Sequence, residues 1–355
     1  MFNCSDDVLA HHNDETTLPF TDRDNMRARR NTNRDRLKDG LSAKGLPSVL
    51  EFKSQGSYAM RTMVRHPDND YDIDDGTYFD AAVLIGSRGG EMTALQARCM
   101  VRDAVDNGSF NKAPEVRTNC VRIYYALGYH VDMPVYRRVT TKDFLGNETV
   151  HHELASSDWI RSDARDVTEW FEKENNRQSP DSDNGRQLRR MVRLIKKFAR
   201  SRDSWKGQIL SGFGITKLVT ERFHGNADRE DEALYYTMKG IRDRLQFDLV
   251  VRHPVTPGAT ITKGTDDAKA RFLRDKLTEA LETLAILHRA DCTRENALLA
   301  WDRVFCVDTF EERYDAEKAR KLSTPAILTS GLLKSVGQSQ PARAAVQKSG
   351  GGNYA

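Results

Sequence analysis

Long apolar runs are missing from this sequence. No uninterrupted hydrophobic stretch approaches the roughly 20 residues that a membrane-spanning helix requires. The first residues carry Asp6, Asp7, His11 and His12 where a secretory signal peptide would have its apolar segment. We therefore expect the protein to be soluble and intracellular.

Cysteine is scarce and scattered. The five cysteines are odd in number and have no Cys-x-x-Cys spacing, which argues against a disulfide framework and against a zinc site. The histidine pairs His11-His12 and His151-His152 have no cysteine partner at metal-ligand spacing, so we expect them at the surface. A reducing cytosol fits this pattern best.

An excess of charge of one sign is also absent. Lys and Arg number 55 against 52 Asp and Glu, which gives a formal net charge of +3. Nothing in the overall composition demands a polyanionic partner, so any basic site must be local. The basic stretch 186–206 lacks interleaved exposed aromatics and has an apolar face that fits a core. We interpret it as a solvated or phosphate-lining face rather than a nucleic-acid surface.

The pattern of hydrophobic residues divides the chain into a mixed α/β first half and a helical second half. The first half predicts a long helix over 24–41, strands over 49–53, 71–79, 120–127 and 130–136, and a helix over 93–105. The second half predicts helices over 209–223, 231–250, 266–290 and 295–305, after a helix marked by the spacing of Leu188, Met191, Val192, Ile195 and Phe198. At 355 residues the chain fits two lobes. We expect a core lobe over 1–160, a helical lobe over 161–334 and a flexible glycine-rich tail over 335–355.

Two aspartates stand two residues apart in one predicted strand. Side chains alternate along a strand, so Asp72 and Asp74 project from one face, about 7 Å apart at their Cα atoms. Asp132 lies between two apolar residues in a neighbouring predicted strand and is placed to meet the pair. Three such carboxylates suit two Mg²⁺ ions, or Mn²⁺, held about 3.5 to 4 Å apart to activate a hydroxyl and stabilise a pyrophosphate leaving group.

A Gly-Ser pair lies at a strand-to-helix junction shortly before these aspartates. The backbone N–H groups of Gly56-Ser57 and the N-terminus of a helix over 58–64 could cradle a triphosphate. The pair alone is a very weak signal, and the acidic run Asp72 to Asp75 fits a surface turn equally well by its local pattern. The combination of the Gly-Ser turn with two aspartate-bearing strands favours a metal and phosphate site.

These motifs resemble those of the cGAS/DncV-like nucleotidyltransferases (CD-NTases) of the polymerase-β superfamily, and of their bacterial members in particular. The family pattern is Gly-Ser, a spacer and Asp-hydrophobic-Asp, read here as Gln55-Gly56-Ser57 followed by DIDDGTY over 72–78. The segment HVDMPVY over 130–136 resembles the strand that carries the third metal-binding aspartate. The likeness spans roughly residues 24–305. It implies an α+β fold, in which a polymerase-β-like core with a mixed sheet faces a helical lobe across the active-site cleft.

The resemblance also implies roles for side chains outside the aspartate motif. Lys196 resembles the family's triphosphate-contacting lysine, with Lys197 as a rival, and Ser211 resembles its phosphate-contacting serine. Ser162 and Asp163 match residues that contact a nucleobase, although Ser162 also fits the N-cap of the following helix. In a weaker match, whose alignment needs a gap near Gly128, Arg122 faces the acceptor nucleotide.

The activity that the resemblance implies is synthesis of a cyclic di- or trinucleotide second messenger from nucleoside triphosphates, ATP among them, with release of pyrophosphate, in antiphage (CBASS) signalling. Asp72, Asp74 and Asp132 would bind the metal ions, and Asp132 would help activate the attacking ribose hydroxyl. A linear polymerase or a protein AMP-transferase would need the same carboxylates. A catalytically silent nucleotide-binding scaffold is a further alternative, against which the presence of all three aspartates argues.

Two features bear on regulation. The zinc-binding insertion of the animal cGAS enzymes is not visible, so we do not expect activation by double-stranded DNA. The segment 350–355 would be accessible to a regulatory partner protein that conjugates the C-terminus. It fits an ordinary flexible end equally well.

Overall fold

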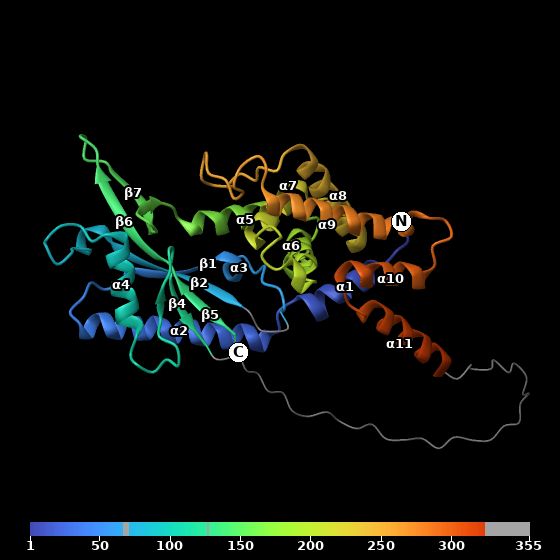
Figure 1. Ribbon diagram of the computed structural model, residues 1–355, viewed down its shortest axis with the longest axis horizontal. Coiled ribbons are helices and arrows are strands. Elements are labelled where there is room, and N and C mark those ends of the chain that lie inside the picture. The colour runs from blue at the N-terminus through green and yellow to red at the C-terminus, as the bar shows by residue number, and fades with distance from the viewer. Residues whose placement is uncertain (67–70, 126–127, 324–355) are drawn as a thin grey trace, which may run out of the picture. The chain divides into compact units, whose positions relative to one another are not determined.

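The change from mixed to helical pattern is present in the structure as two neighbouring groups of elements (Figure 1). The computed structural model describes residues 1–66, 71–125 and 128–323. The first group comprises α2 (Phe20–Ala43), β1 (Glu51–Gln55), α3 (Gly56–Ala59), β2 (Asp72–Asp80), α4 (Ala94–Val105), β3 (Glu115–Val116), β4 (Val121–Tyr124), β5 (His130–Met133), β6 (Val135–Lys142), β7 (Glu148–Ala155) and β8 (Trp159–Arg161). The helical elements are α1 (Ser5–His11), α5 (Ala164–Gln178), α6 (Gln187–Ala199), α7 (Gly212–Arg222), α8 (Glu230–Phe247), α9 (Ala268–Thr283), α10 (Arg294–Phe305) and α11 (Thr309–Ser323).

A mixed sheet forms the centre of the first group. Within the described ranges its strands follow the order β3-β4-β5-β2-β6-β7-β8, and β1 also pairs with β2. β2 is antiparallel to β1 and parallel to β5 along its first residues and to β6 along its last. The single strand predicted over 130–136 is thus two strands, because Pro134, which has no N–H group, separates them. Hydrogen bonds on both edges of β2 fix its register at the middle of the sheet.

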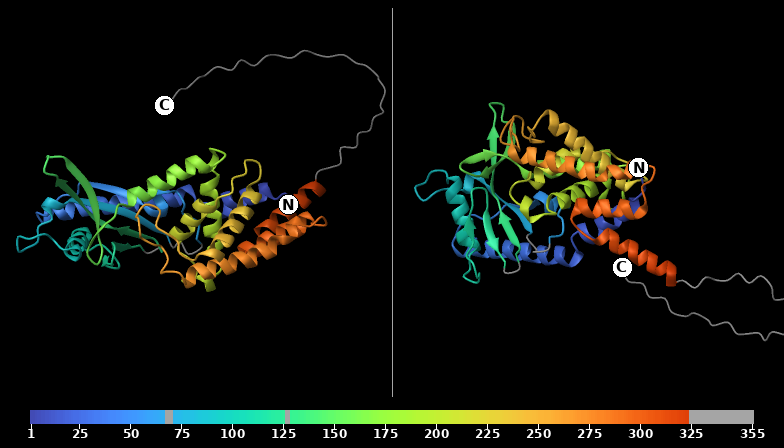
Figure 2. Two further views of the ribbon diagram at one scale, coloured as in Figure 1. Left: turned by 90° about the horizontal axis from the view of Figure 1, so that it is seen from above. Right: turned by 45° about the vertical axis from the view of Figure 1, so that its right-hand side comes forward.

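The helices α2 and α4 cover one face of this sheet (Figure 2). Leu37 and Leu41 of α2 and Val101 of α4 pack with Phe79 and Val131 of the strands in one buried cluster. α2 is otherwise strongly polar and exposes most of its length. The other face of the sheet is thereby left to the functional residues.

A second hydrophobic core lies within the helices α5 to α10. The N-terminal segment, where the sequence has no periodicity, packs into this core through Val8 of α1 and through Cys4, which precedes the helix. His11 and His12 are each 1% exposed, so the expectation that they lie at the surface was wrong. Burial disfavours a charged imidazole and lowers the pKa of both rings to about 3. His11 stacks on Phe310 as a neutral ring.

The other histidine pair is also less exposed than predicted. His151 and His152 lie in β7 with partly buried side chains. His152 Nδ1 is 3.0 Å from Asp163 Oδ2, and His151 Nε2 is 3.1 Å from Glu153 Oε1. Both rings therefore belong to polar networks along the sheet.

The chain divides into the compact unit Met1–Tyr314 and a second unit, Asp315–Ala355. The lobe boundary at residue 160 stays a prediction, and the tail expected over 335–355 lies outside the described residues. None of the described helices is both long enough and apolar enough to cross a membrane.

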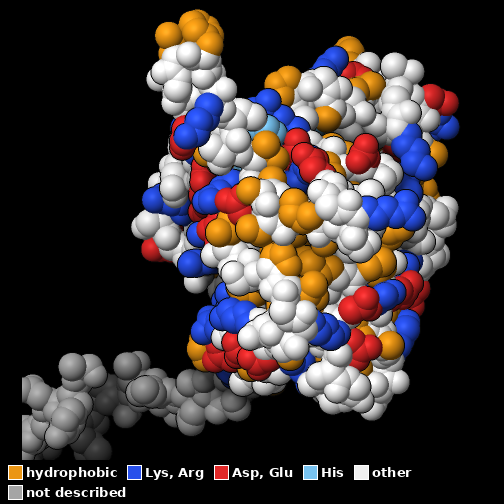
Figure 3. Space-filling model, turned by 90° about the vertical axis from the view of Figure 1, so that its left-hand side faces the viewer, with side chains coloured by type: hydrophobic (Ala, Val, Ile, Leu, Met, Phe, Trp, Pro, Cys, Tyr) orange, Lys and Arg blue, Asp and Glu red, His pale blue; other side chains and the backbone are white. Residues whose placement is uncertain are grey.

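The hairpin β6–β7 ends in an apolar tip, which Figure 3 shows projecting from the molecule. Phe144 is 94% and Leu145 72% exposed, in the turn between the two strands. The tip is outside both hydrophobic cores.

Gly40 allows α2 and α4 to approach closely, and its replacement tests their packing. A Cβ at Gly40 would lie 1.8 Å from the carbonyl oxygen of Ala104 in α4. We expect Gly40→Ala to lower the free energy of unfolding by about 1–3 kcal/mol, although alanine favours helix formation. Gly90→Ala is the control, because a Cβ there meets nothing within 4 Å. Equal denaturation midpoints for the two variants would contradict the close packing.

Candidate active site

A row of four polar residues crosses the sheet on the face away from α2 and α4. Gln55 pairs with Asp74 across β1 and β2, Asp74 with Asp132 across β2 and β5, and Asp132 with Arg122 across β5 and β4. Asp72 is on the same face as Asp74, two residues earlier in β2. The structure therefore brings together the three aspartates that strand alternation predicts to meet.

The alternative of an acidic surface turn was wrong. All four residues from Asp72 to Asp75 belong to β2. Asp75 points to the opposite face, where it is fully buried and accepts two hydrogen bonds from Arg34 of α2, 2.6 and 2.5 Å long. Asp75 thus ties β2 to α2, whereas Asp72 and Asp74 face the other way.

Arg122 occupies both carboxylate oxygens of Asp132. Its Nε donates to Oδ1 at 2.8 Å and its Nη2 to Oδ2 at 2.7 Å, while Nη2 is also 3.7 Å from Asp72 Oδ1. The Nδ1 atom of His130 is 3.3 Å from the same Asp72 oxygen. Sequence reasoning gave Arg122 only a weak role and missed His130, although both face the aspartates in the strand register.

The donor set suits a divalent cation. Burial, and then the neighbouring carboxylates Asp132 and Asp72, raise the pKa of Asp74 to about 7. Such mutual repulsion is relieved when a cation binds between the carboxylates. Within the described ranges no three His, Cys, Asp or Glu side chains already form a metal-binding group. Mg²⁺ can use one or two carboxylates together with waters and substrate phosphates, so Asp72 and Asp74 suffice to begin such a site.

The Gly-Ser turn lies directly against Asp74. Gly56 has a φ of +63°, and a Cβ at this position would lie 2.1 Å from Asp74 Oδ2. Only glycine therefore satisfies both the left-handed backbone and the close approach. The helix expected over 58–64 was wrong: α3 ends at Ala59, and Arg61 adopts a left-handed conformation with φ +54°, which cannot continue a helix.

Three cations on one face of α6 bind three consecutive carbonyl oxygens after this turn. Arg189 Nε donates to Met60 O (3.0 Å), Arg193 Nε to Arg61 O (2.8 Å) and Lys196 Nζ to Thr62 O (3.3 Å). The spacing i, i+4, i+7 places the three side chains in one line along the helix. We call this set the α6 ladder. It attaches the segment 60–62 to the helical group.

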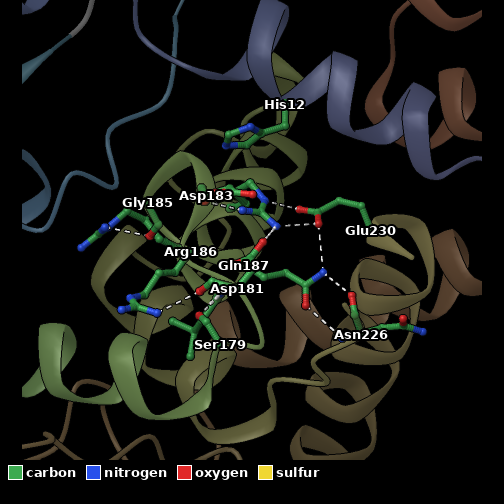
Figure 4. Close-up of polar contacts among 12 residues, drawn as sticks. His12, Ser179, Asp181, Asp183, Gly185, Arg186, Gln187, Asn226 and Glu230 are labelled. Atoms are coloured by element: carbon green, nitrogen blue, oxygen red, sulfur yellow. Dashed lines mark hydrogen bonds and ion pairs between the residues drawn. The ribbon is translucent and has the colours of Figure 1, made fainter. Parts of the chain in front are cut away.

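Buried polar contacts fix the start of α6 itself (Figure 4). Arg190 donates to Glu230 at 2.7 and 2.9 Å and to Asp181 at 2.6 Å. Gln187 donates to Glu230 at 2.9 Å and exchanges hydrogen bonds with the backbone of Asn226. These contacts hold α6 against α8 and thereby position the α6 ladder.

Lys196 and its rival Lys197 have different surroundings. Lys196 is 6% exposed and lines the cleft described below, where its Nζ also donates to Thr62 Oγ1 at 3.0 Å. Burial, and then the charges of Arg200 and Arg193, lower its pKa to about 7. Lys197 is not among the cleft residues. The geometry thus favours Lys196 as the phosphate ligand, a role that stays a prediction.

A cleft of about 660 Å³ lies between the sheet and the helices. Its walls carry Gln55, Gly56, Ser57, Asp72, Asp74, Tyr136, Ala164, Val167, Lys196, Arg200, Gly212 and Phe213, among others. Tyr136 donates its hydroxyl proton to Gln55 Oε1 at 3.0 Å and so fixes the amide of Gln55. Residues from β1, β2, β6, α5, α6 and α7 therefore face one shared space.

Five residues that the sequence assigned to the site do not line this cleft: Arg122, Asp132, Ser162, Asp163 and Ser211. Ser211 is the N-cap of α7 and borders an adjoining cavity of about 230 Å³, which shares Lys196, Arg200 and Gly212 with the cleft. The predicted N-cap role of Ser162 was wrong, because Asp163 caps α5 by accepting from Arg165 N at 3.0 Å. Asp163 also accepts from the Tyr78 hydroxyl at 3.0 Å.

The buried lysine predicts a characteristic pH dependence of stability. The Lys196 amine has a pKa of about 7 when folded and its ordinary value of 10.5 when released to water. Between these values the unfolded chain binds more protons, so stability rises with pH. We expect wild type to gain stability relative to Lys196→Met from pH 7 to 10, by at most about 1.4 kcal/mol per pH unit. Urea unfolding of both proteins across this range measures it, and parallel curves would contradict the burial of a titrating amine.

Comparisons with known proteins agree with this arrangement of residues. The family model described as "Cyclic GMP-AMP synthase DncV-like, nucleotidyltransferase domain" matches residues 50–136, which carry the Gly-Ser turn and all three aspartates. A curated relative, the cyclic GMP-AMP synthase of Escherichia albertii, is 26% identical over 322 residues. The match covers 83% of this chain and 65% of that protein, so the chain spans less than two thirds of the relative's length.

Solved structures share the fold. The Vibrio cholerae DncV cyclic AMP-GMP synthase superposes with a TM-score of 0.66 at 19% identity, covering 86% of this chain and 96% of that chain. Escherichia coli DncV with 3′-deoxy GTP has a TM-score of 0.61 at 18% identity, covering 82% and 92%. The predicted α+β core with a helical lobe is thereby confirmed. Residues 50–136 thus match a DncV-like nucleotidyltransferase domain, and the fold is similar to that of the DncV synthases.

Proposed function

We propose that this protein is a nucleotidyltransferase that joins nucleoside triphosphates into a cyclic di- or trinucleotide and releases pyrophosphate. The observation that carries the proposal is the contact between Gly56 and Asp74. It places a phosphate-binding turn directly beside the carboxylates in a cleft that also contains Lys196. A triphosphate at the turn would therefore have its reacting phosphorus next to the proposed metal ligands.

In this mechanism the chain positions the reactants. The backbone N–H groups after Gly56, the Ser57 hydroxyl and the Lys196 amine would hold the donor triphosphate, with Ser211 contributing from the adjoining cavity. Two Mg²⁺ ions, or Mn²⁺, held by Asp72, Asp74 and Asp132 would activate the attacking hydroxyl and neutralise the leaving pyrophosphate. Positioning and electrostatic stabilisation supply most of the rate in such reactions.

Arg122 would have to leave Asp132 before that carboxylate can bind a cation. Its guanidinium matches phosphate as well as carboxylate, so an acceptor nucleotide offers it an alternative partner. Asp163, which caps α5 and accepts a hydrogen bond from Tyr78, and its neighbour Ser162 remain our candidates for contacts to a base, although neither lines the cleft itself.

The cyclic product is favoured by the relatives. The Vibrio cholerae DncV synthase has been solved with the linear intermediate 5′ pppA(3′,5′)pG, at 20% identity and a TM-score of 0.64. We propose antiphage CBASS signalling in the cytoplasm as the setting. The absence of disulfides among the five cysteines, all of which are free, supports a reducing compartment. A linear polymerase or a protein AMP-transferase is the second candidate, because the same carboxylates serve it.

Product analysis tests the proposal. Incubation with all four ribonucleoside triphosphates and Mg²⁺ should yield pyrophosphate and a short, phosphatase-resistant oligonucleotide whose mass identifies the ring. We expect Asp72→Ala with Asp74→Ala to abolish both products while the chain remains folded, as judged by circular dichroism. If this variant still released pyrophosphate, the result would contradict the assignment of the catalytic role to these carboxylates. Growing chains or labelled protein would identify the second candidate.

A pair of glycine variants separates backbone strain from the contact with Asp74. Gly56 and Gly89 both have a positive φ, but a Cβ at Gly89 meets nothing within 4 Å. Each alanine substitution should cost about 1 kcal/mol of stability through its left-handed backbone. Only Gly56→Ala should also lower kcat, by at least about 100-fold, because it displaces the Asp74 carboxylate. Thermal unfolding and steady-state turnover measure the two effects, and equal kcat values would contradict the proposed contact.

A further inference from the structure

Two tyrosines stack on each other beside the active-site cleft. Tyr78 of β2 and Tyr136 of β6 are directly opposite in the strand register, and their rings lie 4.6 Å apart at the centroids with an angle of 8° between their planes. Tyr78 is 1% and Tyr136 3% exposed. Side chains alternate along β2, so Tyr78 projects from the same face of the sheet as Asp74. The stacked pair therefore lies on the face that carries the aspartates.

Burial keeps both hydroxyl groups protonated. It is the largest influence on each of them, and it raises the pKa of Tyr136 and of Tyr78 above the ordinary value. A buried hydroxyl that keeps its proton requires an acceptor. The Tyr78 hydroxyl donates to Asp163 Oδ1, and the Tyr136 hydroxyl donates to Gln55 Oε1, each at 3.0 Å. The two stacked rings are thus bound to two different acceptors.

The contact of Tyr78 anchors the stack to the helices. Asp163 is the N-cap of α5 and also accepts from Arg165 Nε at 2.8 Å. The guanidinium carbon of Arg165 lies 4.8 Å from the centroid of the Tyr78 ring. Tyr78 cannot tilt without disturbing one of these contacts. Tyr136 therefore packs against a ring that is itself fixed.

The contact of Tyr136 decides which end of the Gln55 amide is free. Gln55 is 4% exposed, lines the cleft and pairs with Asp74 across the β1–β2 ladder. A side-chain amide has an acceptor oxygen at one end and two N–H donors at the other. Because Tyr136 occupies Oε1, the donors on Nε2 are at the opposite end, and no group in the described part of the chain accepts from them. A buried amide thus offers two unused donors beside the cleft.

We propose that Tyr136 is a positioning residue for the donor nucleotide: its hydroxyl holds the Gln55 amide so that Nε2 donates to the triphosphate at the Gly-Ser turn. The inference rests on the proposed function, because it takes a nucleoside triphosphate as the occupant of the cleft. Phosphate oxygens accept hydrogen bonds and carry negative charge, so they match the nitrogen end of the amide and are repelled by its oxygen. Gln55 directly precedes Gly56, so its donors add to the backbone N–H groups of the turn.

Loss of the Tyr136 hydroxyl would remove this control and leave the stacked ring in place. The Gln55 amide could then turn over and present its oxygen to the phosphate, with the same shape and the opposite polarity. A change at an atom directed at Gln55 would therefore appear as weaker binding of the nucleotide.

Nucleotide binding tests the inference. The probe is the α,β-methylene analogue of ATP with Mg²⁺, whose bridging carbon prevents release of pyrophosphate. We expect Tyr136→Phe and Gln55→Leu each to raise its Kd about tenfold in isothermal titration of the full chain, the effect of one hydrogen bond to a charged group. Tyr125→Phe is the matched control, because the Tyr125 hydroxyl donates to Asn33 and does not line the cleft. This control should bind like wild type, within about twofold.

The double variant separates action through Gln55 from a direct contact with the nucleotide. Introduced into Gln55→Leu, Tyr136→Phe should change the Kd by less than about twofold, because the amide that the hydroxyl positions is already absent. A further loss of about tenfold in the double variant would overturn the positioning role, since the hydroxyl would then act without Gln55. Equal Kd values for wild type and Tyr136→Phe would overturn it as well.

Turnover and stability provide two further measurements. The KM of Tyr136→Phe should rise about tenfold with the Kd while kcat stays within about threefold, because the lost hydrogen bond is made to the bound substrate as well as to the transition state. A lower kcat with an unchanged KM would contradict this. Tyr136→Phe and Tyr125→Phe each lose one buried hydrogen bond, so their thermal unfolding midpoints should fall by similar amounts. A much larger fall for Tyr136→Phe would indicate a structural role instead.

The two levels of the argument fail in different ways. A folded wild-type chain that binds no analogue would overturn the proposed function, and the inference with it. Binding that Tyr136→Phe leaves unchanged would overturn the inference alone.

Discussion

The register of β2 between β1 and β5 is the constraint on which the site depends. It places Gln55, Asp74 and Asp132 side by side, and it brings the turn after β1 against the Asp74 carboxylate. A slip of one residue would send both cleft aspartates into the core and bring Ile73 and Asp75 into the cleft. Asp75 resists such a slip from the other face, because its ion pair with Arg34 requires that carboxylate to face α2.

The helical group contributes buried positive charge, which is costly away from water. Arg189, Arg193 and Lys196 are each at most 9% exposed, and their donors are satisfied mainly by backbone carbonyl oxygens rather than by carboxylates. Arg189 also pairs with the carboxylate of Glu172, whereas Arg193 stays hydrogen-bonded with no carboxylate partner in the described part of the chain. A positive potential is thereby retained beside a cleft whose sheet side is acidic, a separation of charge that suits a metal-bound triphosphate.

Strand alternation was enough to predict which faces Asp72, Asp74 and Ile73 take, because that rule is local. The positions of His11 and His12 could not be predicted this way. Their burial depends on distant contacts: His12 with Arg193 of α6, 181 residues further along the chain, and His11 with Phe310. The short length of α3 follows from the left-handed backbone conformation of Arg61, which no feature of the sequence predicts for an arginine. The pairing of Arg122 with Asp132 becomes readable only once the β4–β5 register is known.

The α6 ladder has a mechanical consequence. β1 is fastened to β2 up to Gln55, and residues 60–62 are fastened to α6. Only residues 56–59 separate these two attachments, and they contain the Gly-Ser turn for which we propose phosphate binding. Any displacement of the helices against the sheet must flex this stretch, so the turn is the hinge of that connection as well as the element that we propose to bind the triphosphate. A nucleotide bound to this turn would restrict the motion of the helices relative to the sheet. By the same coupling, greater flexibility of the turn would weaken nucleotide binding.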